Sequence, residues 1–227
     1  MIDLNLLKNK NTIIVSTPRS SSTYFLECVY ESMLERFGYE SIKVEDEIPN
    51  TLDENNISTI CKLLLPNYKD VFFKESQIII LYPRKDYISH YTSLIIPLYS
   101  EIVSDKMLHW NAIPNENKTL EITADDVKKE FESLNKIDNA RAKKLIAYVT
   151  QVMIEFKIEV DKIKKSNTIL FETSYDEVYN WNKNNKQSLI WKDPKDKLQM
   201  FEDPSFVINE IERSISSIGH WPTKNNC

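Results

Sequence analysis

One arginine surrounded by hydroxyl residues, within residues 15–24, has the side-chain types that bind a small anion. This stretch reads VSTPRSSSTY, follows a short apolar run and leads into a helical pattern. The first backbone N–H groups of a helix have no partner within the helix and carry the positive end of its dipole, so they attract anions. We therefore expect a guanidinium and several hydroxyls to converge on one anion beside this helix start. They belong to Arg19, Ser20, Ser21, Ser22 and Thr23.

The same loop argues against one common chemistry. A loop that cradles a nucleoside triphosphate needs G-x-x-x-x-G-K-[ST], in which the glycines let the backbone wrap the phosphates and the lysine reaches the terminal one. The sequence lacks this motif and holds only two glycines, Gly38 and Gly219. An ATP- or GTP-hydrolysing site is therefore not expected. A plainer interpretation stays open, because Ser and Thr cap helices and Pro suits a first turn.

Residues 17–23, TPRSSST, resemble the 5′-phosphosulfate loop of sulfotransferases that use 3′-phosphoadenosine 5′-phosphosulfate (PAPS). That loop runs like YPKSGTTW or PRSGSSxL in the family. Arg19 matches the family's Lys or Arg, Ser22 and Thr23 match its hydroxyl pair, and Ser21 stands where Gly is common. A serine can serve at that position if its backbone dihedrals stay negative. The resemblance implies a PAPS-binding loop made of Pro18, Arg19, Ser20, Ser21, Ser22 and Thr23.

A second stretch, PRKDYISHYTS at residues 83–93, is similar to the family's 3′-phosphate motif. In that motif a basic residue at a strand end is followed by a serine on the next helix, as in R-R-D-x6-S. Arg84 and Ser93 fit this form and are the expected cofactor-binding pair, with Lys85 and Ser89 as alternates. The run Arg-Lys-Asp is also typical of a solvated helix start.

The resemblance also suggests catalytic residues. Residues 61–66, CKLLLP, are similar to the K-T-H-L-P of some sulfotransferases, so Lys62 matches the lysine that assists the leaving group. Leu64 replaces the histidine base of that motif. Other branches of the family use a glutamate after the first helix, and KVEDEIP at residues 43–49 offers Glu45 and Glu47. Glu47 is the preferred base because its placement before a proline turn resembles the Gly-Glu-Phe-Phe type of segment in those branches, although acidic clusters are most often plain surface.

The apolar pattern predicts the elements that position these residues. Near-continuous apolar runs are typical of strands buried on both faces of a parallel sheet, and helical patterns lie between them. We expect an α/β fold with a parallel sheet flanked by helices and a helix-rich C-terminal half, as one domain over residues 1–227; the resemblance implies a P-loop nucleotide-hydrolase-like sulfotransferase architecture. The expected strands are Thr12–Ser16, 57–65, Gln77–Tyr82 and 168–172. The expected helices are Ser22–Phe37, one from about residue 85 that Pro97 should kink or end, and 124–134, 137–165, 174–184 and 204–217.

Composition narrows the function classes further. The chain has 227 residues and a net charge of −5, so a broad nucleic-acid-binding face is not expected. No apolar run approaches the roughly 20 residues that span a bilayer, and the N-terminus shows no signal peptide. The three cysteines lack metal-like or paired spacing and favour a reducing compartment, which suggests a cytoplasmic protein. The histidines are scattered, and no metal is expected.

The expected activity is transfer of a sulfuryl group from PAPS to a hydroxyl or amine of a small-molecule or glycan acceptor. Two alternatives stay open. One is a small-metabolite kinase of P-loop-like fold, and the other is a non-catalytic nucleotide-binding protein derived from the sulfotransferase fold. Neither the acceptor nor the oligomeric state follows from the sequence.

Overall fold

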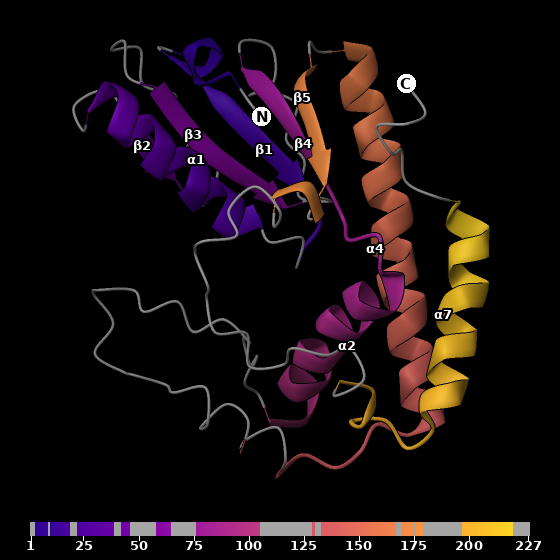
Figure 1. The fold of residues 1–227 in the computed structure, drawn as a ribbon. Helices are drawn as coiled ribbons and strands as arrows, with labels where there is room; N and C mark the ends of the chain where they lie inside the picture. The colour runs from indigo at the N-terminus through magenta and orange to yellow at the C-terminus, as the bar shows by residue number, and fades with distance from the viewer. Residues whose placement is uncertain are drawn as a thin grey trace. The chain divides into compact units, whose positions relative to one another are not determined.

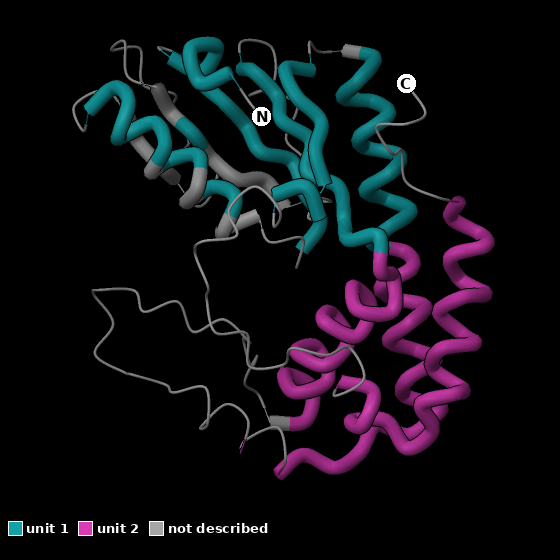
Figure 2. The backbone as a smooth tube through the Cα atoms, viewed as in Figure 1, with its two compact units in different colours: residues 1–85, 152–184, 221–227 teal, residues 86–151, 185–220 magenta. Residues whose placement is uncertain are grey.

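The computed structural model describes residues 3–8, 10–18, 22–38, 42–45, 58–64, 76–104, 129, 133–166, 169–174, 176–178 and 197–219. The chain divides into two compact units (Figure 2). Unit 1 holds residues 1–85, 152–184 and 221–227, and unit 2 holds residues 86–151 and 185–220. The single domain predicted over residues 1–227 stays a prediction.

Unit 1 contains a sheet of five parallel strands in the order β2-β3-β1-β4-β5 (Figure 1). The parallel α/β fold predicted from the apolar runs is therefore confirmed. Parallel strands that follow one another in the sequence need a crossover connection, and among the described elements α1 (Ser22–Phe37) lies between β1 and β2 while α2 (Tyr87–Ser104) and α4 (Asn139–Ser166) lie between β4 and β5. The strands are β1 (Thr12–Ser16), β2 (Ile42–Glu45), β3 (Ser58–Leu64), β4 (Gln77–Tyr82) and β5 (Ile169–Ser174).

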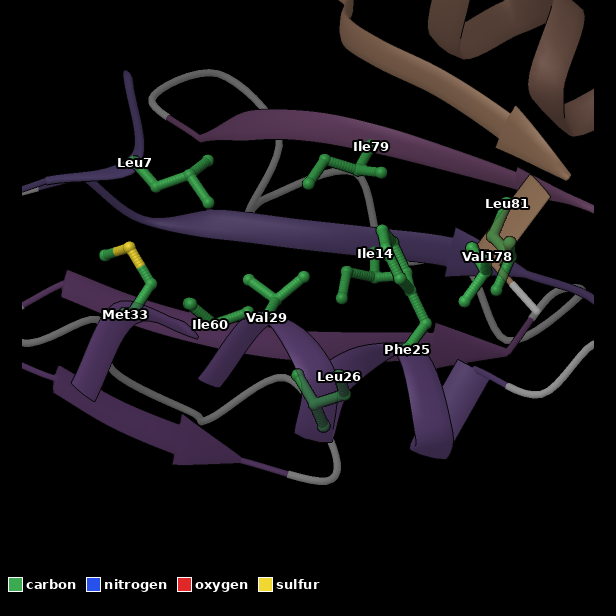
Figure 3. Close-up of a cluster of buried hydrophobic side chains, with 10 residues drawn as sticks. All are labelled: Leu7, Ile14, Phe25, Leu26, Val29, Met33, Ile60, Ile79, Leu81 and Val178. Carbon is green, nitrogen blue, oxygen red and sulfur yellow. The ribbon is translucent and has the colours of Figure 1, made fainter. Parts of the chain in front are cut away.

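The main core of unit 1 lies between the sheet and helix α1 (Ser22–Phe37), as Figure 3 shows. Successive residues of a strand face opposite sides of the sheet, so alternate positions of β1, β3 and β4 turn toward this helix. The helix contributes side chains from every third or fourth position, as its sequence pattern predicted. The sheet contributes Ile14, Ile60, Ile79 and Leu81, the helix contributes Phe25, Leu26, Val29 and Met33, and Leu7 and Val178 complete the cluster.

The opposite face of the sheet is packed by part of helix α4 (Asn139–Ser166). Tyr82 lies on the face opposite to Ile79 and Leu81, and its ring meets the ring of Phe156 edge-on at 6.3 Å between centroids. The predicted apolar stripe of this helix is confirmed by burial along its whole length, through Leu145, Val149, Val152, Phe156, Val160 and Ile163.

Two predictions about elements need correction. Strand β2 (Ile42–Glu45) was not predicted, because its four residues IKVE alternate apolar and charged side chains instead of forming a continuous apolar run. Such alternation suits a strand at the edge of a sheet, which is where β2 lies. Of the two effects predicted for Pro97, a kink or an end, the end is wrong, since helix α2 (Tyr87–Ser104) continues through the proline to Ser104. The predicted helices at 124–134 and 174–184 fall mostly outside the described residues.

Unit 2 contains α2, the first part of α4 and α7 (Pro204–Ile218). Helix α7 begins where the sequence predicted, because the Asp203 carboxylate accepts the backbone N–H of Phe206 at 3.0 Å and Pro204 occupies the first turn. The segments before α4 and α7 are joined by a parallel bridge between Ile137 and Phe201. No helix in the described ranges is long and apolar enough to cross a bilayer.

Tyr91 of α2 is fully buried in unit 2, and it provides a pH-dependent term in stability. The Thr150 hydroxyl donates to the carbonyl of Ile146 at 2.7 Å, so Tyr91 must donate its own proton to Thr150 Oγ1 at 3.2 Å. Burial raises the pKa of Tyr91 above the ordinary value of 10.0. A raised pKa means that the folded state holds the proton more tightly than the unfolded state does. The contribution of Tyr91 to the free energy of unfolding is therefore complete below pH 10 and is lost as the pH rises above that value.

We expect Tyr91→Phe to cost about 1 kcal/mol of unfolding free energy at neutral pH, from loss of one hydrogen bond. The difference in unfolding free energy between wild type and variant should stay constant up to about pH 10 and then shrink. Denaturant titrations of both proteins at several pH values measure it. A difference that does not change above pH 10 would contradict the prediction.

Candidate functional site

The predicted anion loop leaves the sheet at its central strand. Strand β1 ends at Ser16, which lies in register with Leu64 of β3 and Leu81 of β4. All three strands are parallel, so their carboxyl ends meet at one edge. Ser16 and the following Thr17 are fully buried at that edge. Residues that follow β3 and β4, the two strands beside β1, can therefore lie close to a loop in this position.

The strand order makes this edge a topological switch point. The connection from β1 to β2 runs toward one side of the sheet, while the connections from β2 to β3, β3 to β4 and β4 to β5 run toward the other. Right-handed crossovers in opposite directions lie on opposite faces of a sheet, so α1 and the part of α4 in unit 1 are expected on different faces. The packing agrees, since α1 covers Ile14 and α4 meets Tyr82 on the other face. In open α/β sheets, ligands bind in the crevice at such a point.

Helix α1 begins at Ser22, directly after the loop, and its first turn contains no acidic residue. The strand, loop and helix therefore follow one another as the sequence predicted. The positive end of the helix dipole lies in this segment, and no carboxylate in the first turn opposes it. Pro18 is half-buried at the loop start. Arg19, Ser20, Ser21 and the side chains of Ser22 and Thr23 lie outside the described part of the chain.

The predicted catalytic residues fall on or beside two strands. Lys62 belongs to β3, in register with Ile14 of the central strand and two residues before the strand ends. Glu45 is the last residue of β2, in register with Cys61 of β3. The backbones of Lys62 and Glu45 therefore lie close to the carboxyl ends of β3 and β2, the two strands on one side of β1. Glu47 lies outside the described residues.

The predicted 3′-phosphate motif begins at the other neighbour of β1. Arg84 follows the end of β4 in unit 1, and its side chain is half-buried. Ser93 lies in unit 2, on α2, where it is 1% exposed and its hydroxyl donates to the carbonyl of His90 at 2.7 Å. A contact from Ser93 to phosphate would require that hydroxyl proton, since phosphate oxygens only accept. The alternate Ser89 is buried in the first turn of α2.

The start of α2 has a capped form. The Asp86 carboxylate accepts the backbone N–H of Ser89 at 3.0 Å, and the Asp86 carbonyl accepts that of His90 at 3.0 Å. Asp86 is therefore the N-cap of α2, in agreement with the alternative interpretation of Arg-Lys-Asp as a helix start. Arg84 and Lys85 precede this cap in the sequence.

The sequence did not predict a cluster of hydrogen-bonded polar side chains that joins β4, β5 and α4 in unit 1. Tyr82 donates its hydroxyl proton to Glu172 at 2.7 Å, and the Lys164 ammonium donates to the same oxygen at 2.7 Å. The Lys164 nitrogen also lies 5.6 Å from the centre of the Tyr82 ring. Just beyond β5, the Asp176 carboxylate accepts the backbone N–H of Lys85 at 2.9 Å. The capping-box pattern S-x-x-E at residues 174–177 is a sequence signal that predicts a helix start just beyond β5, where Asp176 lies.

The described residues contain no group of three or more His, Cys, Asp or Glu side chains that could hold a metal ion. No protein-family model, curated protein or solved structure matches the chain. The fold and the site therefore define an α/β protein with a parallel sheet, whose Arg- and hydroxyl-bearing loop leaves the central strand at a switch point.

Proposed function

We propose that the protein is a PAPS-dependent sulfotransferase of P-loop-like architecture. The observation that carries the proposal is the position of the stretch VSTPRSSSTY, which runs from the last two residues of the central strand β1 into the first residues of α1. The ends of central strands at switch points are where α/β proteins bind phosphate groups. The loop has an arginine and hydroxyls suited to a phosphosulfate, and it lacks the glycines and lysine that a triphosphate requires.

The position of the second basic motif supports the same proposal. Arg84 follows β4, which pairs directly with β1, and both strands end at the same edge. A nucleotide with phosphates at its 5′ and 3′ positions needs two anion sites near one another. Two basic segments on adjacent strand ends meet that requirement better than one would.

Sulfuryl transfer requires positioning and charge stabilisation more than covalent chemistry by the protein. The acceptor oxygen or nitrogen bonds to sulfur while the bond from sulfur to the 5′-phosphate oxygen breaks in line. Arg19 and the N-terminus of α1 stabilise the negative charge that develops on the departing phosphate. Lys62 neutralises charge on the transferring group, and Glu47, or Glu45, takes the proton of the acceptor. The product nucleotide is 3′-phosphoadenosine 5′-phosphate (PAP).

The acceptor proposed is a small molecule or glycan with a hydroxyl or amine, and the proposed compartment is the cytoplasm. No metal has a role in this mechanism, since the arginine and lysine side chains supply the positive charge. The two open alternatives, a kinase and a non-catalytic nucleotide-binding protein, differ from the proposal in measurable ways.

We expect PAP to raise the melting temperature, because it binds the folded state and not the unfolded chain. At about 100 times its Kd, a ligand adds about 2.7 kcal/mol of stability, which for a chain of this size corresponds to about 5–10 °C. Differential scanning fluorimetry with PAP, PAPS and ATP–Mg²⁺ measures the shift, and sulfur-labelled PAPS with a panel of alcohols, amines and oligosaccharides measures transfer.

Each alternative has its own signature in these assays. Stabilisation by ATP–Mg²⁺ in preference to PAP would support the kinase and overturn the proposal. Stabilisation by PAP without label transfer to any acceptor would support the non-catalytic protein. Adenosine 5′-phosphate is the matched control ligand, because it lacks the 3′-phosphate that Arg84 is proposed to bind, and we expect it to stabilise the protein less than PAP.

A further inference from the structure

The turn that connects β4 to α2 is held at one backbone atom by a residue distant in the sequence. The Asp176 carboxylate accepts the N–H of Lys85 at 2.9 Å, across a separation of 91 residues. The turn contains Arg84, the predicted ligand of the 3′-phosphate. Because this N–H is already donated to a carboxylate, it is not available to a phosphate, and an anion contact from Lys85 must come from its side chain.

Asp176 is itself held in a well-defined local structure. It lies in a helical turn that the structure describes over residues 176–178, shortly after β5 ends at Ser174. The hydroxyl of Thr173 donates to the carboxylate of Glu177 at 2.9 Å, and the backbone N–H of Glu177 donates to the Ser174 hydroxyl at 3.4 Å. Val178 at the end of this turn is buried in the core beneath α1. The carboxylate that meets Lys85 is therefore attached to the sheet through β5 and to the core through Val178.

The residue before the turn is held as well. Tyr82, the last residue of β4, is bonded to Glu172 of β5, and Lys164 of α4 donates to the same carboxylate. Strand β5 and the segment just beyond it thus contact the polypeptide on both sides of Arg84, at Tyr82 through Glu172 of β5 and at Lys85 through Asp176. A site residue works best when the backbone that carries it is fixed by a supporting set of hydrogen bonds.

We propose that Asp176 is a positioning residue, which fixes the backbone of the 83–86 turn so that Arg84 meets the 3′-phosphate of the nucleotide. This inference rests on the proposed function, since it assumes that the turn binds a phosphate. Asp176 does not touch the nucleotide and acts through the hydrogen bond to Lys85. A negative charge near a phosphate site opposes binding, so the useful property of Asp176 is its acceptor oxygen and not its charge.

The test compares Asp176→Ala with Asp176→Asn by calorimetric titration of PAP. Asparagine retains an oxygen that accepts the Lys85 N–H, so Asp176→Asn should bind PAP within about twofold of wild type or more tightly. Alanine removes the acceptor, and we expect the Kd for PAP to rise about tenfold, the effect of losing one hydrogen bond to a charged group. Asp176→Ser, whose hydroxyl is shorter, should behave like alanine and serves if Asp176→Ala does not fold.

A double-mutant cycle with Arg84→Ala separates positioning from general loss of structure. If Asp176 acts through Arg84, Asp176→Ala should weaken PAP binding much less in the Arg84→Ala background than in wild type. Asp203→Ala is the matched control, because its carboxylate also accepts a backbone N–H, that of Phe206 at 3.0 Å, in unit 2. It should lower the melting temperature and leave the Kd for PAP unchanged.

The outcomes distinguish the inference from the proposed function. If wild type shows no affinity for PAP, the proposed function fails and the role of Asp176 fails with it. If wild type binds PAP and Asp176→Ala binds equally well, only the inference is overturned. Equal weakening by Asn and Ala, additive effects in the cycle, or tighter binding by both variants would also overturn it, since each assigns the effect to something other than the Lys85 hydrogen bond.

Discussion

Replacing Arg19 with alanine should lower kcat/KM for sulfuryl transfer by about 10²–10³-fold, the effect typical of removing one preorganised donor to a developing negative charge. Arg19 is the one cation in the loop that joins β1 to α1. It is proposed to bind the 5′-phosphosulfate and to stabilise the phosphate oxygen released in the reaction. Because that charge increases toward the transition state, the variant should lose kcat as well as affinity. Initial rates with sulfur-labelled PAPS over a range of concentrations measure both.

Two further variants define what the arginine contributes. Arg19→Lys keeps the charge but loses the planar pair of donors, so we expect an activity between those of wild type and Arg19→Ala. Arg36→Ala is the matched control, because Arg36 is exposed in the last turn of the same helix, away from the loop. Removing this cation from a helix C-terminus should cost about 0.3–1 kcal/mol of stability and no activity. Full activity in Arg19→Ala would contradict the proposed function.

Replacing Phe25 with alanine should have the largest effect on stability, lowering the unfolding free energy by about 3–5 kcal/mol. Phe25 is 1% exposed and lies in the cluster between α1 and the sheet (Figure 3). The lost ring leaves a cavity beneath the first turns of α1, the helix whose N-terminus is proposed to bind the phosphosulfate. Urea denaturation followed by circular dichroism measures the change in free energy.

Matched variants show whether the effect comes from burial. Phe25→Leu retains most of the apolar volume and should cost well under half as much as alanine. Leu6→Ala lies in the same unit, but Leu6 is 50% exposed, and surface substitutions of this kind usually change stability by less than about 0.5 kcal/mol. Equal losses in Phe25→Ala and Leu6→Ala would contradict the assignment of Phe25 to the core.

The elements with strong apolar patterns were predictable from the sequence. The bounds of β1, β4 and α1 are those predicted, and α4 and α7 begin and end within two residues of prediction. These segments are buried along a regular period, so the pattern of apolar residues carries their position. Strand β2 was missed because an edge strand is buried on fewer sides and needs only two apolar residues, Ile42 and Val44. The prediction that Pro97 kinks or ends α2 rests on local propensity, which disfavours a proline inside a helix, whereas the burial of the surrounding residues favours continuation to Ser104.

The residues predicted for the candidate site occur in short contiguous stretches of the sequence. Residue type and spacing predict an anion loop at residues 18–23, because a helix N-terminus attracts anions through its own backbone. They were also enough to exclude the glycine-rich triphosphate loop, whose residues must all be present in one segment. These inferences depend only on residues that are adjacent in the sequence, so they can be made without knowledge of the fold.

The tertiary structure decided which segments meet. Only the strand order β2-β3-β1-β4-β5 places the anion loop at the centre of the sheet and the Arg84 turn on the adjacent strand. Only the folded chain brings Asp176 to the N–H of Lys85 and Glu172 to Tyr82, across 91 and 90 residues. Such contacts have no local signature, because the residues that form them are selected by sheet pairing and packing of the whole core. The sequence by itself therefore determined the bounds of the strongly apolar elements and predicts the kind of site, and the fold determined which distant residues contact the segments that carry it.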